Sequence, residues 1–420
     1  MWRTLSTCFY FMMMGANDAA YGALIPYIED SYGLSDMVVS LLFLSPVVGY
    51  SSAALLNSAV HNRWGQRGVA VIGPTCHVLA YIAVALHPPY PILVVVFVFA
   101  GFANGLGEAA WNAFLGNMAN SNEVLGFLHG FYGLGAALSP IAATSLIEKA
   151  GWLWYAFYYI MIGGAVLELA TSLSSFWHLS GRVYREARSY VTVTDKSYYR
   201  QSLKKRVTWI MAIYLFVYNG IEVGLGGWIV TFMRRERSGQ PFESGIVAMG
   251  YWIGIMLGRF ALGFLTPRLG EKFAAILYMV LSILCQLLFW LVPEFHVSAV
   301  AVSLHGFFLG PLFPAAVVVA RKSLPAQLYV PALGFAVASS GGGGGVLPFA
   351  IGALAQAKGV SIFPPVTLAM LIVILILWVC LPTLDKSSTQ QDDKEGQWKN
   401  IDIDLVHVSR RTIVKLRDRR

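Results

Sequence analysis

The same polar and glycine pattern occurs twice in this 420-residue chain, about 205 residues apart. Asp18, in GANDAAYG, is followed 204 positions later by Glu222, in NGIEVGLG. The string SAVHNRWGQR at 58–67 returns 205 positions later as GFLTPRLGEK. Glycines and a proline between 126 and 140 return 208 positions later. A near-constant offset in three separate patterns indicates two parallel copies of one unit.

The composition places both copies in a membrane. The chain is 57% hydrophobic and 12% charged, whereas soluble domains carry about 25% charged residues. Its apolar residues fall in stretches of about 20, enough to cross a bilayer as helix. We therefore predict an all-α integral membrane protein of twelve transmembrane helices in two pseudo-symmetric six-helix bundles. The expected spans are roughly 5–27, 38–60, 69–87, 92–117, 125–147, 152–176, 207–230, 243–265, 273–291, 297–320, 332–355 and 362–382.

Basic residues predict the orientation and the division of the chain. Most of the 30 lysine and arginine residues fall in connections on the side of the N-terminus, and few fall on the other side. The positive-inside rule then predicts that both termini are cytoplasmic. We expect an N-terminal bundle at 1–178, a basic cytoplasmic linker at 179–206, a C-terminal bundle at 207–383 and a disordered cytoplasmic tail at 384–420. The net charge of +8 therefore indicates contact with the lipid bilayer and no nucleic-acid partner.

Several chemical functions find no support in the sequence. The four cysteines match no metal site or disulfide framework, and we expect no metal and no cofactor. The glycine run SSGGGGGVLPF at 339–349 lacks the Lys-Ser/Thr ending of a phosphate loop. We interpret it, with its counterpart in the first half, as a helix hinge. The hinge residues are Gly133, Gly135, Pro140, Gly341, Gly343 and Pro348. No nucleophile lies near a base, so we predict no catalytic residue and no enzyme.

Carboxyl groups within the spans are the first candidates for function, because ionisable groups are costly in a membrane. Asp18, Glu108, Glu168 and Glu222 all lie within predicted spans. A carboxyl group in a low-dielectric cavity can take up and release a proton near neutral pH. We assign Asp18 and Glu108 to proton coupling and solute binding. Glu168 has no polar neighbour along its span, and we expect a structural role for it.

The residues one helical turn from these acids are candidates for a solute cavity. Acid, amide and aromatic groups on one helix face suit a polyol, whose hydroxyls and C–H faces they match. For Glu222 and for His129, a purely structural hydrogen-bonding role remains an alternative. The cavity candidates are Asn17, Tyr21, Trp111, Asn112, His129, Tyr132, Tyr218, Asn219 and Glu222.

The repeated loop after the second and eighth spans predicts a gate at the cytoplasmic end. Its arginines can cap or pair across helices when the protein is closed on one side. We expect Arg259, near the inner end of its span, to support the same contact. The gating residues are Arg63, Gly65, Arg67, Arg259, Arg268 and Gly270.

Twelve spans, a six-plus-six duplication and this loop resemble the major facilitator superfamily. Asn62 and Pro267 replace the Asp of the family's loop, and Ser58 replaces its first Gly. The strings GANDAAYGALIPYIEDSYGLS, GLGEAAWNAF and LHGFYGLGAALSP are similar to fucose–proton symporter-like transporters, in particular to fungal members related to the yeast bypass-of-stop-codon transporters.

The resemblance implies roles for individual residues. In that family an Asp of the first span and a Glu of the fourth serve proton coupling and sugar recognition, and they fall on Asp18 and Glu108. Asn112 matches an Asn one turn after that Glu. His129 stands where the family has Gln, and Trp111 replaces a small residue.

These features predict a secondary active transporter that works by alternating access. The most favoured function is proton-coupled symport of a sugar or similar small polar solute by a monomer. One alternative is an exporter of a drug-like or amphiphilic metabolite. Another is a transporter-like membrane sensor that moves no solute. The sequence leaves plasma membrane and internal membrane both open.

Overall fold

The computed structural model describes residues 1–116, 118, 121–188 and 196–381, and it is helical throughout that part of the chain. The first half contains α1 (Trp2–Tyr32), α2 (Asp36–Val39), α3 (Leu41–Trp64), α4 (Gln66–Ala85), α5 (Tyr90–Gly116), α6 (Ser121–Glu148), the short 3-10 helix η1 (Trp154–Ala156) and α7 (Phe157–Phe176). The second half contains α10 (Arg206–Glu236), α11 (Pro241–Leu269), α12 (Glu271–Leu291), α13 (Phe295–Leu309), α14 (Leu312–Ser323), α15 (Ala326–Lys358), η2 (Val360–Ile362) and α16 (Phe363–Val379).

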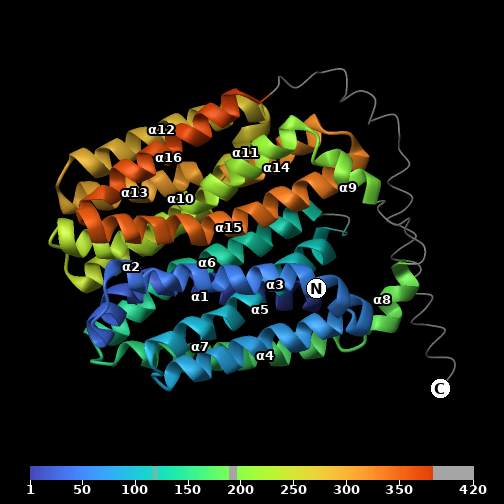
Figure 1. Cartoon of the computed structure of the whole chain (residues 1–420), viewed down its shortest axis with the longest axis horizontal. Helices are drawn as coiled ribbons and strands as arrows, with labels where there is room; N and C mark the ends of the chain where they lie inside the picture. Colours follow the sequence, from blue (N-terminus) through green and yellow to red (C-terminus); the bar gives the residue numbers. More distant parts are fainter. Residues whose placement is uncertain (117, 119–120, 189–195, 382–420) are drawn as a thin grey trace.

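The expected twelve spans agree with these helices. In the described residues, 11 segments are long and apolar enough to cross a membrane. The helix α1, with 31 residues, brings the number to twelve although it carries Asp18, Glu29 and Asp30. The predicted span at 297–320 is divided into α13 and α14, because Pro311 follows Gly310 and has no N–H to continue the helix. The helices of each half lie on their own side of the molecule (Figure 1).

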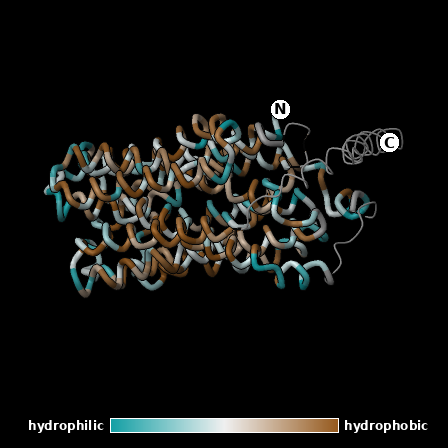
Figure 2. Tube along the Cα trace, turned by 90° about the horizontal axis from the view of Figure 1, so that it is seen from above, coloured by the Kyte–Doolittle hydropathy of each residue, from teal (hydrophilic) through white to brown (hydrophobic). Residues whose placement is uncertain are grey.

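Hydrophobic residues dominate the length of the helices, and hydrophilic residues gather toward the two ends of the molecule (Figure 2). At one end, Glu294 begins α13 and accepts a hydrogen bond from the Val297 N–H at 2.6 Å. This bond and the neighbouring His296 lower the pKa of the exposed Glu294 carboxyl to about 2. Caps of this kind satisfy the free N–H groups at the start of a helix.

The predicted linker is partly helical. The short helix α8 (Gly181–Arg188) packs against the first half, where the Arg185 guanidinium donates to the carbonyl of Asn62. The short helix α9 (Lys196–Ser202) packs against α15 in the second half. The end of the molecule that carries these two helices is called the linker end below. Residues 189–195 and the predicted disordered tail at 384–420 lie outside the described residues.

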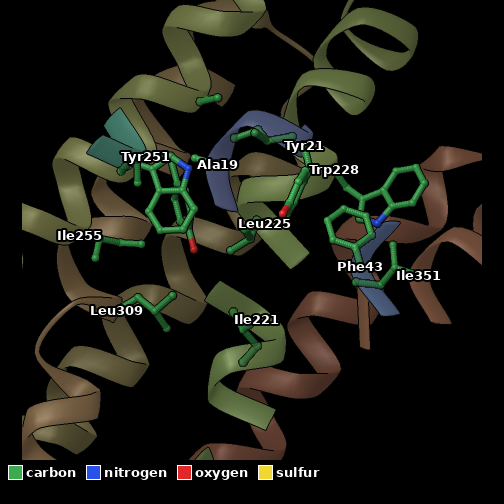
Figure 3. Packing of buried hydrophobic residues seen from close by; sticks show 14 of the residues in the cluster. Ala19, Tyr21, Phe43, Ile221, Leu225, Trp228, Tyr251, Ile255, Leu309 and Ile351 are labelled. Atoms are coloured by element: carbon green, nitrogen blue, oxygen red, sulfur yellow. The ribbon is translucent and has the colours of Figure 1, made fainter. Parts of the chain in front are cut away.

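A buried hydrophobic cluster joins the two halves. It contains residues of both, among them Tyr21 and Phe43 from the first half and Trp228 and Tyr251 from the second. Figure 3 shows Phe43 beside the Trp228 indole, and their ring centroids are 6.2 Å apart. Gly22 of α1 lies so close to α10 that an added Cβ would stand 2.1 Å from the carbonyl oxygen of Gly226. Small residues at such crossings let helix backbones approach in the membrane.

The glycines predicted as hinges also hold helices close together, in the same way in both halves. A Cβ on Gly135 of α6 would lie 1.9 Å from the carbonyl oxygen of Met12 on α1. A Cβ on Gly343 of α15 would lie 1.8 Å from that of Phe216 on α10. Both α6 and α15 run unbroken through these positions. Their bending during transport remains a prediction.

Substitution of alanine for Gly343 is expected to destabilise the protein by about 1–3 kcal/mol, the usual cost of overpacking. The backbone of α10 must move to admit the new methyl group, and a backbone carbonyl cannot rotate away as a flexible side chain would. Thermal unfolding of the purified protein in detergent measures the effect. Gly341→Ala is the matched control, since a Cβ there meets nothing within 4 Å. Equal melting temperatures for both variants would contradict this prediction.

Candidate functional site

Asp18 lies midway along α1 and is held by three hydrogen-bond donors. Its Oδ1 accepts from the Asn17 amide at 3.1 Å and from the Asn104 amide of α5 at 2.8 Å. Its Oδ2 accepts from the Tyr132 hydroxyl of α6 at 3.1 Å. The side chain remains partly exposed. Donors from three helices stabilise the ionised carboxylate at a depth where water is scarce.

Glu108 lies on α5 and differs from Asp18 in having no partner. Its carboxylate makes no hydrogen bond or ion pair with any residue that the structure describes. It is partly exposed, and it lies within electrostatic range of Asp18 in its own half and of Glu222 in the other. A carboxylate within a membrane span requires a proton, a cation or a donor group. Glu108 is therefore available to an incoming ligand or proton.

Asn112 and His129 extend this polar region by one helical turn. The Asn112 amide donates to the Glu108 backbone carbonyl at 2.9 Å, and its Oδ1 lies 3.2 Å from Nε2 of His129. Both side chains are partly exposed. His129 packs edge-on against Phe11 and lies within electrostatic range of Arg259 of the second half. The predicted residues of α5 and α6 are thus brought together near the boundary between the halves.

The second half contributes an ion pair. Glu222 on α10 accepts from the Arg259 guanidinium at 2.8 Å, and the two side chains are 7% and 16% exposed. Tyr132 lies within electrostatic range of both. Arg259 therefore lies opposite the acids of the first half. The predicted gating role placed Arg259 with the loop at Gly270, whereas in the structure its guanidinium contacts Glu222 of α10 and the Gly310 carbonyl.

Trp111, Tyr21 and Tyr218 lie deeper than expected for residues that contact a solute. Trp111 is fully buried and stacks on Phe176 with 4.4 Å between ring centroids. Its place one position before Asn112 turns it about 100° away around the helix, into the core of its own half. The Tyr21 hydroxyl accepts from the buried Asn17, and the Tyr218 hydroxyl donates to the Leu309 carbonyl. Asn219 is partly exposed, and its amide donates to Ser340.

The remaining gating residues lie at the linker end within their own halves. Arg63 lies over the Trp64 ring, and Arg67 lies over the ring of Trp177. Gly65 and Gly270 each end a helix with positive φ, at 67° and 85°, a conformation that favours glycine. Arg268 is exposed. The ion pairs Arg182–Glu186 and Lys322–Glu271 at this end each lie within one half.

The opposite end of the molecule is bridged by Arg235 of α10. Its guanidinium pairs with Glu29 of α1 and with Asp36 of α2, both at 2.6 Å. In the part of the chain that the structure describes, these are the ion pairs that join the two halves. Lys149 adds a contact over the ring of Phe242 at 3.7 Å. The halves are therefore ionically linked at the end away from the linker.

Sequence reasoning missed two polar residues, His77 of α4 and Asn104 of α5. Both are fully buried. Nδ1 of His77 lies 3.0 Å from the Glu168 carboxylate, and Nε2 lies 2.9 Å from Oδ1 of Asn104. Glu168 is thus paired with a residue of another helix, although its own span offers no charged neighbour. The available signal was a polar residue near the middle of each of three separate spans.

Two pseudo-symmetric six-helix halves with polar groups at their boundary are an architecture that membrane transporters use. The comparisons with known proteins give its family. The chain belongs to the Major Facilitator Superfamily, whose model matches residues 7–327 and 224–417. It is accordingly a multi-pass integral membrane transporter of small-molecule solutes and not an enzyme.

Two relatives of known name match most of the chain. It is 27% identical over 415 residues to Bypass of stop codon protein 6 of Saccharomyces cerevisiae, covering 91% of this chain and 83% of the relative. It is 23% identical over 360 residues to the glucose/mannose transporter GlcP of Bacillus subtilis, covering 82% and 85%. The first match supports the expected relation to the yeast bypass-of-stop-codon group.

Solved structures share the fold. The D-xylose-proton symporter superposes with a TM-score of 0.69 at 14% identity, covering 90% of this chain and 97% of that one. The transporter FucP in its outward conformation gives 0.62 at 15% identity, with the same coverage. The nucleoside transporter NupG gives 0.73 at 13% identity, covering 90% and 99%. The predicted twelve-helix architecture is confirmed.

Proposed function

We propose that this transporter carries a sugar or a similar small polar solute together with protons. The observation that carries the proposal is the Glu108 carboxylate, which is partly exposed and unpartnered among the described residues, close to Asp18. An acid without a fixed counter-charge is free to exchange a proton as its surroundings change. Asp18, with three donors, would bind a solute hydroxyl or take a proton when one donor leaves.

The chemistry of the boundary favours a polar solute. Asp18, Glu108, Asn112 and His129 are partly exposed, and so are Tyr50 and Tyr132, whose hydroxyl groups lie near the acids, whereas Trp111 is fully buried. Amides and carboxylates match hydroxyl groups in pairs, which suits a polyol. Two comparison proteins bear sugar names, the glucose/mannose transporter and the D-xylose-proton symporter.

The orientation and the assembly state belong to the same proposal. The basic linker end would face the cytoplasm, with both termini, and the Arg235 bridge would close the outer end. A monomer would carry out the cycle. The halves would rock around the acids, and the outward and inward states would differ in the proton affinity of those acids, since coupling requires such a difference.

Proteoliposomes with a trapped pH indicator test the proposed function. Addition of D-glucose, D-xylose or L-fucose outside is expected to acidify the lumen when the protein is present. The Asp18→Asn/Glu108→Gln double variant should give no acidification with the same sugar. Accumulation of an amphiphilic dye without any sugar response would support the exporter alternative. Absence of flux for every solute tried would support the sensor alternative. Either outcome contradicts sugar symport.

A further inference from the structure

A continuous chain of hydrogen bonds connects Glu168, buried where α7 packs against α4, to Asp18. Glu168 on α7 pairs with Nδ1 of His77 on α4 at 3.0 Å. Nε2 of His77 contacts Oδ1 of Asn104 at 2.9 Å, and the Asn104 amide donates to Asp18 at 2.8 Å. Glu168, His77 and Asn104 are all 0% exposed. Two ionisable groups buried this completely need a reason beyond helix packing, because apolar residues would pack as well.

The order of donors along this chain is fixed by what each group can do. A carboxylate only accepts, so the Asn104 atom that faces Asp18 must be the NH₂ group. Oδ1 of Asn104 then faces His77 and needs a donor, so Nε2 of His77 carries hydrogen. One proton lies between Nδ1 of His77 and Glu168, on either atom. The pair thus fixes the His77 tautomer, and His77 fixes the direction in which the Asn104 amide points.

Among the described residues of the first half, the charged groups near Asp18 are this pair and Glu108. The remaining titratable groups around the pair and Asp18 are tyrosines and a thiol, apart from Glu108 on α5. They are Tyr10 and Tyr21 on α1, Tyr50 on α3, Cys76 and Tyr81 on α4, Tyr132 on α6 and Tyr158 on α7. Phenols and thiols stay neutral through the pH range of transport. The second half adds Glu222 and Arg259, which already pair with each other.

We propose that His77 and Glu168 are positioning residues that act through Asn104 to hold a hydrogen-bond donor against Asp18, and so set the pH range in which Asp18 exchanges its proton. The proposal rests on the proposed proton coupling, because Asp18 is there a coupling acid. It separates two roles inside one half. Glu108 is accessible to the ligand, whereas the pH at which Asp18 exchanges its proton is set by the fully buried His77 and Glu168.

Replacement of both members of the pair tests the proposal without leaving a buried charge. His77→Leu/Glu168→Leu keeps the core apolar but removes the donor to Oδ1 of Asn104, so the amide loses its fixed direction. Loss of one donor to a carboxylate is expected to move protonation of Asp18 upward by about one pH unit. Glu168→Gln is the conservative control. Its amide can donate to Nδ1 of His77, which leaves Nε2–H directed at Asn104, and the shift should be absent.

Infrared titration of the purified protein in lipid reads the protonation of Asp18 directly. The band of the protonated carboxyl that is lost in Asp18→Asn identifies this residue. In the double leucine variant this band should persist to about one pH unit higher than in the unmodified protein. Asn104→Leu should give the same shift by breaking the link at its other end. Combining all three substitutions should add nothing further, because groups acting along one path are not additive.

The outcomes are distinct. An unchanged Asp18 band in both the double leucine and the Asn104→Leu proteins overturns the proposal and leaves a purely structural ion pair. A shift in Glu168→Gln as large as that of the double leucine protein also overturns it, because charge and not orientation would then be the cause.

The infrared titration needs no solute and therefore separates this proposal from the proposed function. The rate of D-glucose uptake, measured as a function of pH, is the second measurement. The pH at which uptake falls on the alkaline side should rise by about one unit in the double leucine variant and stay unchanged in Glu168→Gln. If no sugar drives proton movement in the unmodified protein, the proposed function fails. The infrared shift would then still decide whether the pair positions Asn104.

Discussion

Substitution of glutamine for Glu108 is expected to abolish proton-driven accumulation of solute while exchange of solute across the membrane continues. A gradient of two pH units can sustain about a hundredfold accumulation for one coupled proton, since each pH unit corresponds to a factor of ten. Glutamine keeps the size and the hydrogen-bonding capacity of the side chain, so solute can still bind. It cannot ionise, so the pH gradient no longer acts on the cycle. We expect the accumulation ratio to fall from about a hundred to about one.

The measurement compares pH-driven uptake with counterflow in the same proteoliposomes, using a labelled sugar that the unmodified protein accumulates. Glu236→Gln is the control, because Glu236 is an exposed carboxylate at the far end of α10. It should accumulate solute like the unmodified protein. If Glu108→Gln still drives accumulation, Glu108 is not the coupling acid, and Asp18 alone would carry the proton.

Replacement of Arg259 by leucine is expected to destabilise the protein by about 3–5 kcal/mol, the cost of removing one partner of a buried ion pair. Glu222 is 5% exposed as a residue, and it would be left with no guanidinium beside it. The loss should appear as a lower melting temperature in detergent. The double variant Arg259→Leu/Glu222→Gln should recover most of the lost stability, because it removes the uncompensated charge.

Arg268→Leu provides the control for that experiment. Arg268 is exposed at the linker end of α11, and exposed substitutions of this kind change stability by about 0.5 kcal/mol or less. A melting temperature for Arg259→Leu equal to that of the control would mean that Glu222 is not held by the pair. The double variant would then show no recovery.

Some parts of the site could be predicted because they depend on spacing along one helix. Glu108 and Asn112 are four residues apart, and this spacing places them on one face of α5 whatever surrounds it. The same rule misplaced Trp111, which lies three residues after Glu108 but about 100° around α5 from Asn112. In the structure this direction places its indole against Phe176. The position of the neighbouring helices decides whether the Asn112 side or the Trp111 side of α5 faces the core, and the sequence of α5 does not contain this information.

Other parts depend on pairs of helices and were not predictable. His77 and Glu168 are 91 residues apart, and Asn104 lies 27 residues from His77. His77 and Glu168 have no charged residue one helical turn away in their own spans, and Asn104, which shares a face of α5 with Glu108, gives no sign of its partners on α1 and α4. Arg259 was assigned to the gate for the same reason, since its partner Glu222 is 37 residues away. The rule that a buried charge needs a partner predicts that Glu168 and Arg259 are paired, but it does not identify the paired residues.

The sequence alone determined that this chain is a membrane protein of two similar six-helix halves, because apolar length and an internal repeat depend only on residues and their order. It also located the acids within the spans, since charge at the middle of an apolar helix is visible without coordinates. Only the tertiary structure decided which acids are paired, which are open and which end of the molecule is bridged. These properties arise from contacts between helices distant in the chain, and their free energies depend on distance and burial, which a linear sequence does not specify.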